Sequence, residues 1–299
     1  MKYVYVLNSF GNNYINELYQ MIDQISNELN IDHSIEVNSD SYSTEDILNK
    51  YKSSRSIIVP VGGDGMINIV LNGIKGTNNI LGYLPNGTGN DFARTVKETK
   101  LRDGLNKVDV IKINDKYCIN IACFGVDAEI ANDDTYVHNT KIPKKLRYIF
   151  GVPKHFLNYN PKELYISFDD EEIENRFTTV VVCNARYYGS GIKVSPSSIL
   201  NDSMMEVYLV DEMKRLDMVS TILSMKNGKH ETHDGVRKIT TDNVFISSKE
   251  PIDINIDGEK YRDQYFDINL IHNGIEVFNN QNLINSFEEV KKRNKKLFR

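Results

Sequence analysis

The chain has 299 residues, of which 40% are apolar and 26% charged, a composition typical of a globular protein with about two domains. Its formal net charge of −5 argues against a nucleic-acid-binding protein, which carries an excess of lysine and arginine. No apolar run approaches the ~18–20 residues of a membrane-spanning helix, and three cysteines without framework spacing are typical of free thiols. We therefore expect a cytoplasmic protein.

Short apolar runs alternate with helical patterns in residues 1–120. The expected elements are a strand at 3–7, an amphipathic helix at 15–29, a strand at 33–37, a helix after the capping-box sequence Ser43-Thr44-Glu45-Asp46, a strand at 56–61, a helix at 66–74 and a strand at 79–84. Because helices alternate with strands, the sequence predicts a parallel, doubly wound sheet.

Strand-like runs follow one another after residue 120, with few helices between them. They lie at 164–168, 177–183, 205–210, 243–247, 252–256 and 266–271, with helical patterns at 143–157 and 216–225 and in the last ~20 residues. This succession predicts a mainly antiparallel β domain, a sandwich or a similar architecture.

A glycine-rich sequence, Gly62-Gly63-Asp64-Gly65, follows the strand at 56–61 and precedes the helix at 66–74. Glycines let the backbone approach a ligand closely, and a helix start offers unpaired N–H groups to an anion. Asp64 would be repelled by phosphate unless a cation lay between them, so it indicates Mg²⁺. The alternative is a tight turn in which Asp64 caps the helix.

A second glycine loop, residues 85–94, follows the next strand. Since consecutive strands of a parallel sheet end at the same edge, we expect the two loops to lie together, where such sheets bind ligands. Thr88 can donate to a phosphate. Asn90 and Asp91 can bind a metal or cap the following helix, and the sequence leaves both roles open.

The two loops together resemble the catalytic domain of diacylglycerol kinases, whose signatures are G-G-D-G-T-x-N-E and G-T-x-N-D-F-A-R. The second signature is reproduced as Gly87-Thr88-Gly89-Asn90-Asp91-Phe92-Ala93-Arg94. NAD kinases and phosphofructokinases share only the first, so the second is the more specific. Further similarities at 120–128, 184–196, 228–230 and 256–259 extend the resemblance over nearly the whole chain.

The resemblance implies an NAD-kinase-like, doubly wound α/β nucleotide-binding domain at 1–120, to which residues 280–299 return. It implies a mainly antiparallel β-sandwich domain for the lipid substrate at 121–279. The implied activity is ATP-dependent transfer of the γ-phosphate to a lipid hydroxyl, such as that of diacylglycerol, with Mg²⁺.

The resemblance also implies roles for individual residues. Asp257 matches the general base, and Asp64 and Asp91 would serve the catalytic Mg²⁺. A structural Mg²⁺ would take the side chain of Asp202 and the carbonyls of Ile199 and Met204. The residues expected to hold ATP are Asn8, Gly62, Gly63, Asp64, Gly65, Met66, Asn68, Gly87, Thr88, Asn90 and Glu259.

Asp257 has two compatible interpretations. Isoleucines alternate with polar residues from Ile252 to Ile256, which would put Asp257 on the polar face of a strand. A carboxylate there could accept the proton of an attacking hydroxyl. Asp257-Gly258 is also a typical hairpin-turn dipeptide.

Several positions depart from the family pattern. Met66 and Ile69 replace the usual Thr and Glu, the N-terminal loop at Asn8 lacks the usual N-P-x-S-G sequence, and Ser203 stands where the family has Gly. These changes keep open a nucleotide or lipid sensor without catalysis. An NAD-kinase-like enzyme for a soluble metabolite is a further alternative, against which the loop at 87–94 argues.

Two basic segments, 141–150 and 291–299, are suited to contact anionic lipid headgroups at a membrane surface, although a solvated helix end is the preferred interpretation of the second. His230 and His233 have a metal-like spacing but no third ligand nearby, so a surface loop is the simpler interpretation. The lipid acceptor, the nucleotide preference and the oligomeric state, a homodimer included, stay open.

Overall fold

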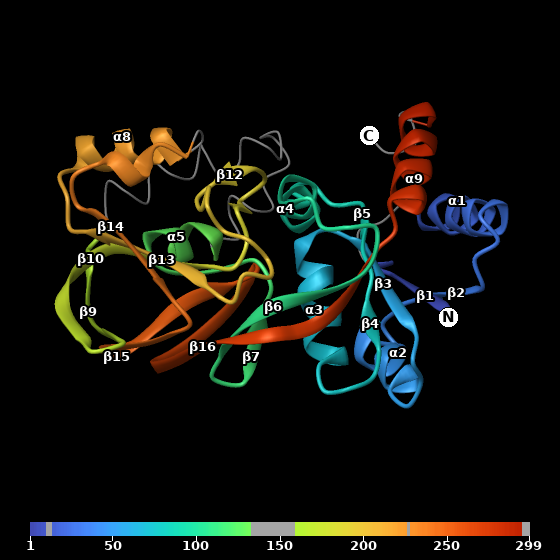
Figure 1. Ribbon diagram of the computed structural model, residues 1–299, viewed down its shortest axis with the longest axis horizontal. Coiled ribbons are helices and arrows are strands. Elements are labelled where there is room, and N and C mark those ends of the chain that lie inside the picture. Colours follow the sequence, from blue (N-terminus) through green and yellow to red (C-terminus); the bar gives the residue numbers. More distant parts are fainter. Residues whose placement is uncertain (10–13, 133–158, 226–227, 295–299) are drawn as a thin grey trace. The chain divides into compact units, whose positions relative to one another are not determined.

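The computed structural model describes residues 1–9, 14–132, 159–225 and 228–294. The chain forms two compact units, which Figure 1 shows. Unit 1 comprises Met1–Gly87, Lys100–Val108 and Ile275–Arg299, and unit 2 comprises Thr88–Thr99 and Asp109–Gly274. The basic segment expected at 141–150, the helix expected at 143–157 and part of the N-terminal loop after Ser9 lie outside the described residues.

Unit 1 contains a parallel sheet. Its strands are β1 (Tyr3–Leu7), β2 (His33–Val37), β3 (Ile57–Gly62), β4 (Ile80–Leu81), β5 (Leu84–Pro85) and the end of β16 (Glu259–Asn279). β1 lies between β2 and β3, and β3 pairs with both β4 and β5. Every residue of β1 is buried, as expected for parallel strands covered on both faces.

The single strand expected at 79–84 is two short strands, β4 and β5, separated by Gly82 and Tyr83. A Cβ atom at Gly82 would lie 2.7 Å from Cγ2 of Val59, so the chain passes β3 too closely for a side chain. Periodicity could not reveal this break, because it depends on the neighbouring strand.

Four helices cover this sheet: α1 (Ile15–Glu28), α2 (Thr44–Tyr51), α3 (Asp64–Ile74) and α9 (Gln281–Arg293). α1 packs against α9 and α2 against α3, as Figure 1 shows. The predicted capping box is confirmed, since Ser43 Oγ accepts from the N–H of Asp46 and the Asp46 carboxylate accepts from that of Ser43. The α/β prediction for the N-terminal part is confirmed.

Unit 2 is built mainly from antiparallel strands. They are β8 (Ile121–Gly125), β9 (Lys162–Phe168), β10 (Glu171–Cys183), β13 (Met205–Asp211), β14 (Val236–Thr241), β15 (Asn243–Ile256) and the first part of β16. The order is β14-β13-β10-β8-β15-β16, and β9 pairs with both β10 and β15. The predicted β-sandwich class is confirmed.

Smaller elements complete unit 2 and its borders. They are α4 (Asp91–Thr99), β6 (Gly104–Ile113), β7 (Lys116–Cys118), α5 (Val126–Ala131), β11 (Tyr187–Tyr188), β12 (Ile192–Lys193), α8 (Arg215–Met225) and a 3₁₀ turn at His230–Thr232. β6 and β16 each contribute residues to both units. No helix among the described residues has the length and apolar character needed to cross a membrane.

Phe287 fixes the C-terminal helix α9 in unit 1, where its side chain is fully buried. We expect Phe287→Ala to lower the free energy of unfolding of the full chain by about 3–5 kcal/mol, because the cavity left behind collapses only partly. Urea denaturation would measure this. Glu289→Ala on the same helix is the control, since that side chain is 67% exposed. Equal losses in the two variants would contradict the packing of α9.

Candidate functional site

The two glycine loops of unit 1 lie side by side at the end of β3. Gly62 is the register partner of Pro85, and the N–H of Asn86 donates to the carbonyl oxygen of Gly62 over 2.8 Å. A Cβ atom at Gly63 would lie 3.2 Å from Cα of Gly87. The backbones therefore approach each other closely, and a side chain at position 63 would crowd the second loop.

The first turn of α3 begins at this junction. Gly63 is its N-cap in an extended conformation, and no side chain caps the helix. The opening N–H groups of a helix have no partner within it, and the helix dipole favours an anion there. A Cβ atom at Gly65 would meet nothing within 4 Å, so the turn is open on that side. The junction has the properties of a phosphate site.

The other residues of unit 1 that bear on the predicted nucleotide site differ in how far they are buried. Met66 is buried, and its Cγ would lie 2.9 Å from a Cβ atom at Gly62, so its side chain fills the space beside that glycine. Asn68 is buried and its Oδ1 accepts from the Asn72 amide. Asn8 lies just after β1, half-buried, and Ile69 is exposed on α3.

Lys291 is a residue near this junction that sequence reasoning assigned to a solvated basic tail. Its Nζ donates to Oδ1 of Asn86 over 2.5 Å and lies 5.8 Å from the centroid of the Phe287 ring. Burial lowers the pKa of the Lys291 ammonium, and the charge of Glu288 acts in the opposite direction. The spacing of four from an apolar residue in α9 was the signal that could have separated Lys291 from the tail.

The second part of the predicted loop belongs to unit 2. Thr88 is exposed, Asn90 has a left-handed backbone with φ of 51°, and Asp91 is the first residue of α4. Asp91 is buried, its Oδ2 accepts from the N–H of Ser190, and its Oδ1 lies 3.7 Å from Nε of Arg94. Asp91 therefore joins α4 to the loop that contains Ser190.

Asp257 forms the tight turn between β15 and β16 that its sequence indicated, with φ of 49° before the positive φ of Gly258. Its buried carboxylate accepts backbone N–H groups from three successive residues. Oδ2 accepts from Ile119 over 2.7 Å, and Oδ1 accepts from Asn120 and Ile121 over 3.0 and 2.9 Å. The Cys118 thiol also donates to Oδ1, and burial followed by the Asp257 charge raises the pKa of that thiol. Glu259 begins β16 and is exposed.

The proposed metal loop, 199–204, is organised around Asp109, a buried residue that sequence reasoning missed. Asp109 Oδ2 accepts from the N–H of Ser203, and its own N–H donates to the carbonyl of Leu200. A lone acid between valines in a buried strand was the signal that could have revealed it.

Asp202 lies in the same loop and is exposed, as are Ile199 and Met204. Partial desolvation raises the pKa of the Asp202 carboxyl, and the charges of Asp109 and Glu206 act in the same direction. Neighbouring negative charges that raise the pKa of Asp202 suit a bound cation, which would relieve the repulsion. Across the described part of the chain, however, no three His, Cys, Asp or Glu side chains converge into a metal-binding group.

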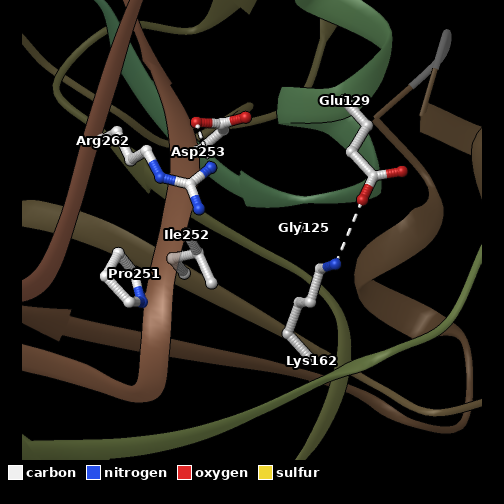
Figure 2. Close-up of a pocket in the computed structure, with 7 residues that line it drawn as sticks. All are labelled: Gly125, Glu129, Lys162, Pro251, Ile252, Asp253 and Arg262. Carbon is white, nitrogen blue, oxygen red and sulfur yellow. Dashed lines mark hydrogen bonds and ion pairs between the residues drawn. The ribbon is translucent and has the colours of Figure 1, made fainter.

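A separate pocket of about 190 Å³ lies in unit 2 and contains none of the predicted site residues (Figure 2). Its lining residues are Gly125, Glu129, Lys162, Pro251, Ile252, Asp253 and Arg262. Two ion pairs form between these lining residues, Lys162 with Glu129 at 3.2 Å and Arg262 with Asp253 at 3.1 Å. Its volume is below the ~300–1,000 Å³ typical of ligand sites, and a charged ligand would compete with both pairs.

Asp257→Ala is expected to destabilise unit 2. Loss of the carboxylate leaves three buried N–H groups without their acceptor, at a cost of about 3 kcal/mol or more. Urea denaturation of the full chain would measure it. Asp115→Ala is the control, because Asp115 is 68% exposed. An Asp257→Ala protein as stable as this control would contradict a structural role for the carboxylate.

Comparison with known proteins shows that both parts of the chain match described protein families. Residues 2–120 match the diacylglycerol kinase catalytic domain, and residues 120–278 match the YegS C-terminal NAD kinase beta sandwich-like domain. The diacylglycerol kinase of Bacillus subtilis (strain 168) is 26% identical over 222 residues, which are 68% of this chain and 71% of the relative.

A solved structure has the same fold. A diacylglycerol kinase structure from Bacillus anthracis str. Sterne superposes with a TM-score of 0.67 at 16% identity, covering 94% of this chain and 98% of the other. The two matches lie in the order that the sequence predicted. The chain belongs to the family with the YegS C-terminal NAD kinase beta sandwich-like domain, and its N-terminal part matches the diacylglycerol kinase catalytic domain.

Proposed function

We propose that the protein is an ATP-dependent lipid kinase that transfers the γ-phosphate to a lipid hydroxyl, such as that of diacylglycerol. The observation that carries the proposal is the junction of the two glycine loops, where a Cβ atom at Gly63 would lie 3.2 Å from Cα of Gly87, beside the uncapped start of α3. Backbone N–H groups at such a junction suit a polyphosphate, which is the part of ATP that a kinase must hold most firmly.

Asp257 is the proposed proton acceptor in the reaction. The hydroxyl oxygen of the lipid forms a bond to the γ-phosphorus, the bond from that phosphorus to the β-phosphate oxygen breaks, and ADP leaves. The hydroxyl proton passes to the Asp257 carboxylate. This carboxylate accepts from three backbone N–H groups and from the Cys118 thiol. The same contacts orient the carboxylate.

Mg²⁺ is the metal that we propose for this reaction, because carboxylate oxygens are ligands that it prefers. Asp64 at the start of α3 and Asp91 at the start of α4 are the proposed side chains for the catalytic ion. Asp202, with the carbonyls of Ile199 and Met204, is proposed for a structural ion, in a loop where neighbouring carboxylates already favour a cation. When bound, Mg²⁺ offsets negative charge on the phosphates.

The lipid acceptor is the least constrained part of the proposal. Diacylglycerol is the substrate named for the Bacillus subtilis relative, and 26% identity supports a lipid hydroxyl more firmly than one particular lipid. Because the acceptor would reside in a bilayer, we propose that the protein works from the cytoplasm with transient contact to the membrane surface.

A transfer assay tests the proposal directly. The full chain is incubated with Mg²⁺, ATP labelled at the γ-phosphate and mixed micelles of diacylglycerol, phosphatidylglycerol, a sphingoid base or an undecaprenyl-type alcohol, beside NAD and a lipid-free control. We expect one labelled lipid. Labelled NADP would instead support the NAD-kinase alternative. ATP binding without any product would support a sensor and assign the departures at Met66 and Ile69 a functional consequence.

Gly63→Ala tests the nucleotide site. This variant is expected to weaken ATP binding about tenfold or more, because its new methyl group would push against the Gly87 backbone. Glu289→Ala is the control and is expected to bind ATP normally, since that side chain lies on α9, outside both glycine loops, and is 67% exposed. Titration calorimetry with ATP would compare the two variants. Equal affinities would contradict a role of the loop junction in ATP binding.

A further inference from the structure

Asp257 and Gly258 form a two-residue turn between β15 and β16. Ile256 and Glu259 are the last register pair of the two strands, so the turn is the whole connection between them. Both turn residues have a positive φ, 49° at Asp257 and 99° at Gly258, as tight hairpin turns require. The N–H of Asp257 donates to the Ile121 carbonyl over 3.1 Å, so β8 holds the first residue of the turn.

Asn255 holds the second residue of the turn. Its side-chain oxygen Oδ1 accepts from the N–H of Gly258 over 2.8 Å. Asn255 is 5% exposed and stands between Ile254 and Ile256, which belong to the hydrophobic core of unit 2. A buried amide destabilises a fold unless its polar atoms are hydrogen-bonded. The position of the Asn255 side chain therefore depends on its partners.

Asn132, the C-cap residue of α5, is the other partner of Asn255. Nδ2 of Asn255 donates to Oδ1 of Asn132 over 2.9 Å, and Nδ2 of Asn132 donates to the Ile254 carbonyl over 3.3 Å. An asparagine amide has a donor end and an acceptor end. Because Asn132 accepts from the donor end, the acceptor end of Asn255 is directed at Gly258.

These contacts bear on the carboxylate of Asp257 through the backbone that carries it. The left-handed conformation of Asp257 is disfavoured for a residue with a Cβ atom, so the turn depends on contacts that hold it in place. Without its acceptor, the N–H of Gly258 would let the turn rearrange and the carboxylate shift. A displacement of about 1 Å at a reacting group can slow a reaction about a hundredfold.

We infer that Asn255 is a positioning residue for the carboxylate of Asp257. It acts through the turn and not through contact with the reacting atoms. The inference rests on the proposed function, in which Asp257 accepts the proton of the lipid hydroxyl. It predicts that Asn255 affects turnover more than ATP binding, because Asn255 acts on the proton acceptor and belongs to neither glycine loop.

Steady-state kinetics of full-length variants test this role. Asn255→Ala is expected to lower kcat about tenfold or more and to change the KM for ATP less than about twofold. Asn114→Ala is the matched control, because the Asn114 side chain also bonds to the backbone of β16, where it donates to the Tyr265 carbonyl and accepts from the N–H of Asp267, each over 2.9 Å.

The control separates positioning from stability. Asn114→Ala also removes side-chain hydrogen bonds from unit 2, yet it is expected to leave kcat within about twofold of the unaltered protein, since these bonds lie away from the turn. A kcat of Asn255→Ala within about twofold of the unaltered protein would overturn the inference. An equal loss of kcat in both variants would overturn it as well.

Hydrogen exchange in the unaltered protein, read by NMR, does not depend on the folding of a variant. The N–H of Gly258 is expected to exchange about tenfold or more slowly than an unprotected amide, because Asn255 accepts it. Exchange at the unprotected rate would refute the contact and the inference with it. If the unaltered protein transfers no phosphate to any lipid, the proposed function fails, and that result differs from an active enzyme that is indifferent to Asn255.

Discussion

One hydrogen bond, from the N–H of Asn86 to the carbonyl oxygen of Gly62, holds the two glycine loops of unit 1 together. It forms because β3 and β5 run parallel and end at the same edge, so the chain after each strand emerges beside the other. The absence of side chains at Gly63 and Gly87 then permits contact between backbones. The uncapped helix start, Met66 and the Lys291 ammonium are all arranged around this contact.

Buried carboxylates have a comparable organising role in unit 2. Asp257 gathers the N–H groups of three successive residues, Asp109 holds the loop at 199–204, and Asp91 receives the N–H of Ser190. In each case an acid satisfies backbone donors that would otherwise be buried without a partner. Asp91 and Asp257, which we propose for the reaction, therefore also have structural roles. Loss of activity in an alanine variant has to be interpreted together with its stability.

The proposed phosphoryl transfer is compatible with this double use. The reaction needs few reacting side chains but precise positions, because positioning and charge stabilisation provide most of the catalysis. A carboxylate fixed by three N–H groups has little freedom to rotate, which suits a proposed proton acceptor at Asp257. Lys291 belongs to neither glycine loop. Its contact with Asn86 depends on the position of α9, some 200 residues further along the sequence.

The sequence by itself determined the order of elements, the two-part α/β and β-sandwich composition and both glycine loops, because these depend on local periodicity and on short motifs. It also indicated the turn at Asp257. Only the tertiary structure decided that the chain at Gly82 separates two short strands and that Asp109 and Asp257 accept backbone N–H groups. It also decided that Lys291, in the basic C-terminal segment, donates to Asn86 of the second glycine loop. Each of these depends on partners distant in the chain, and no local pattern records which segments will meet.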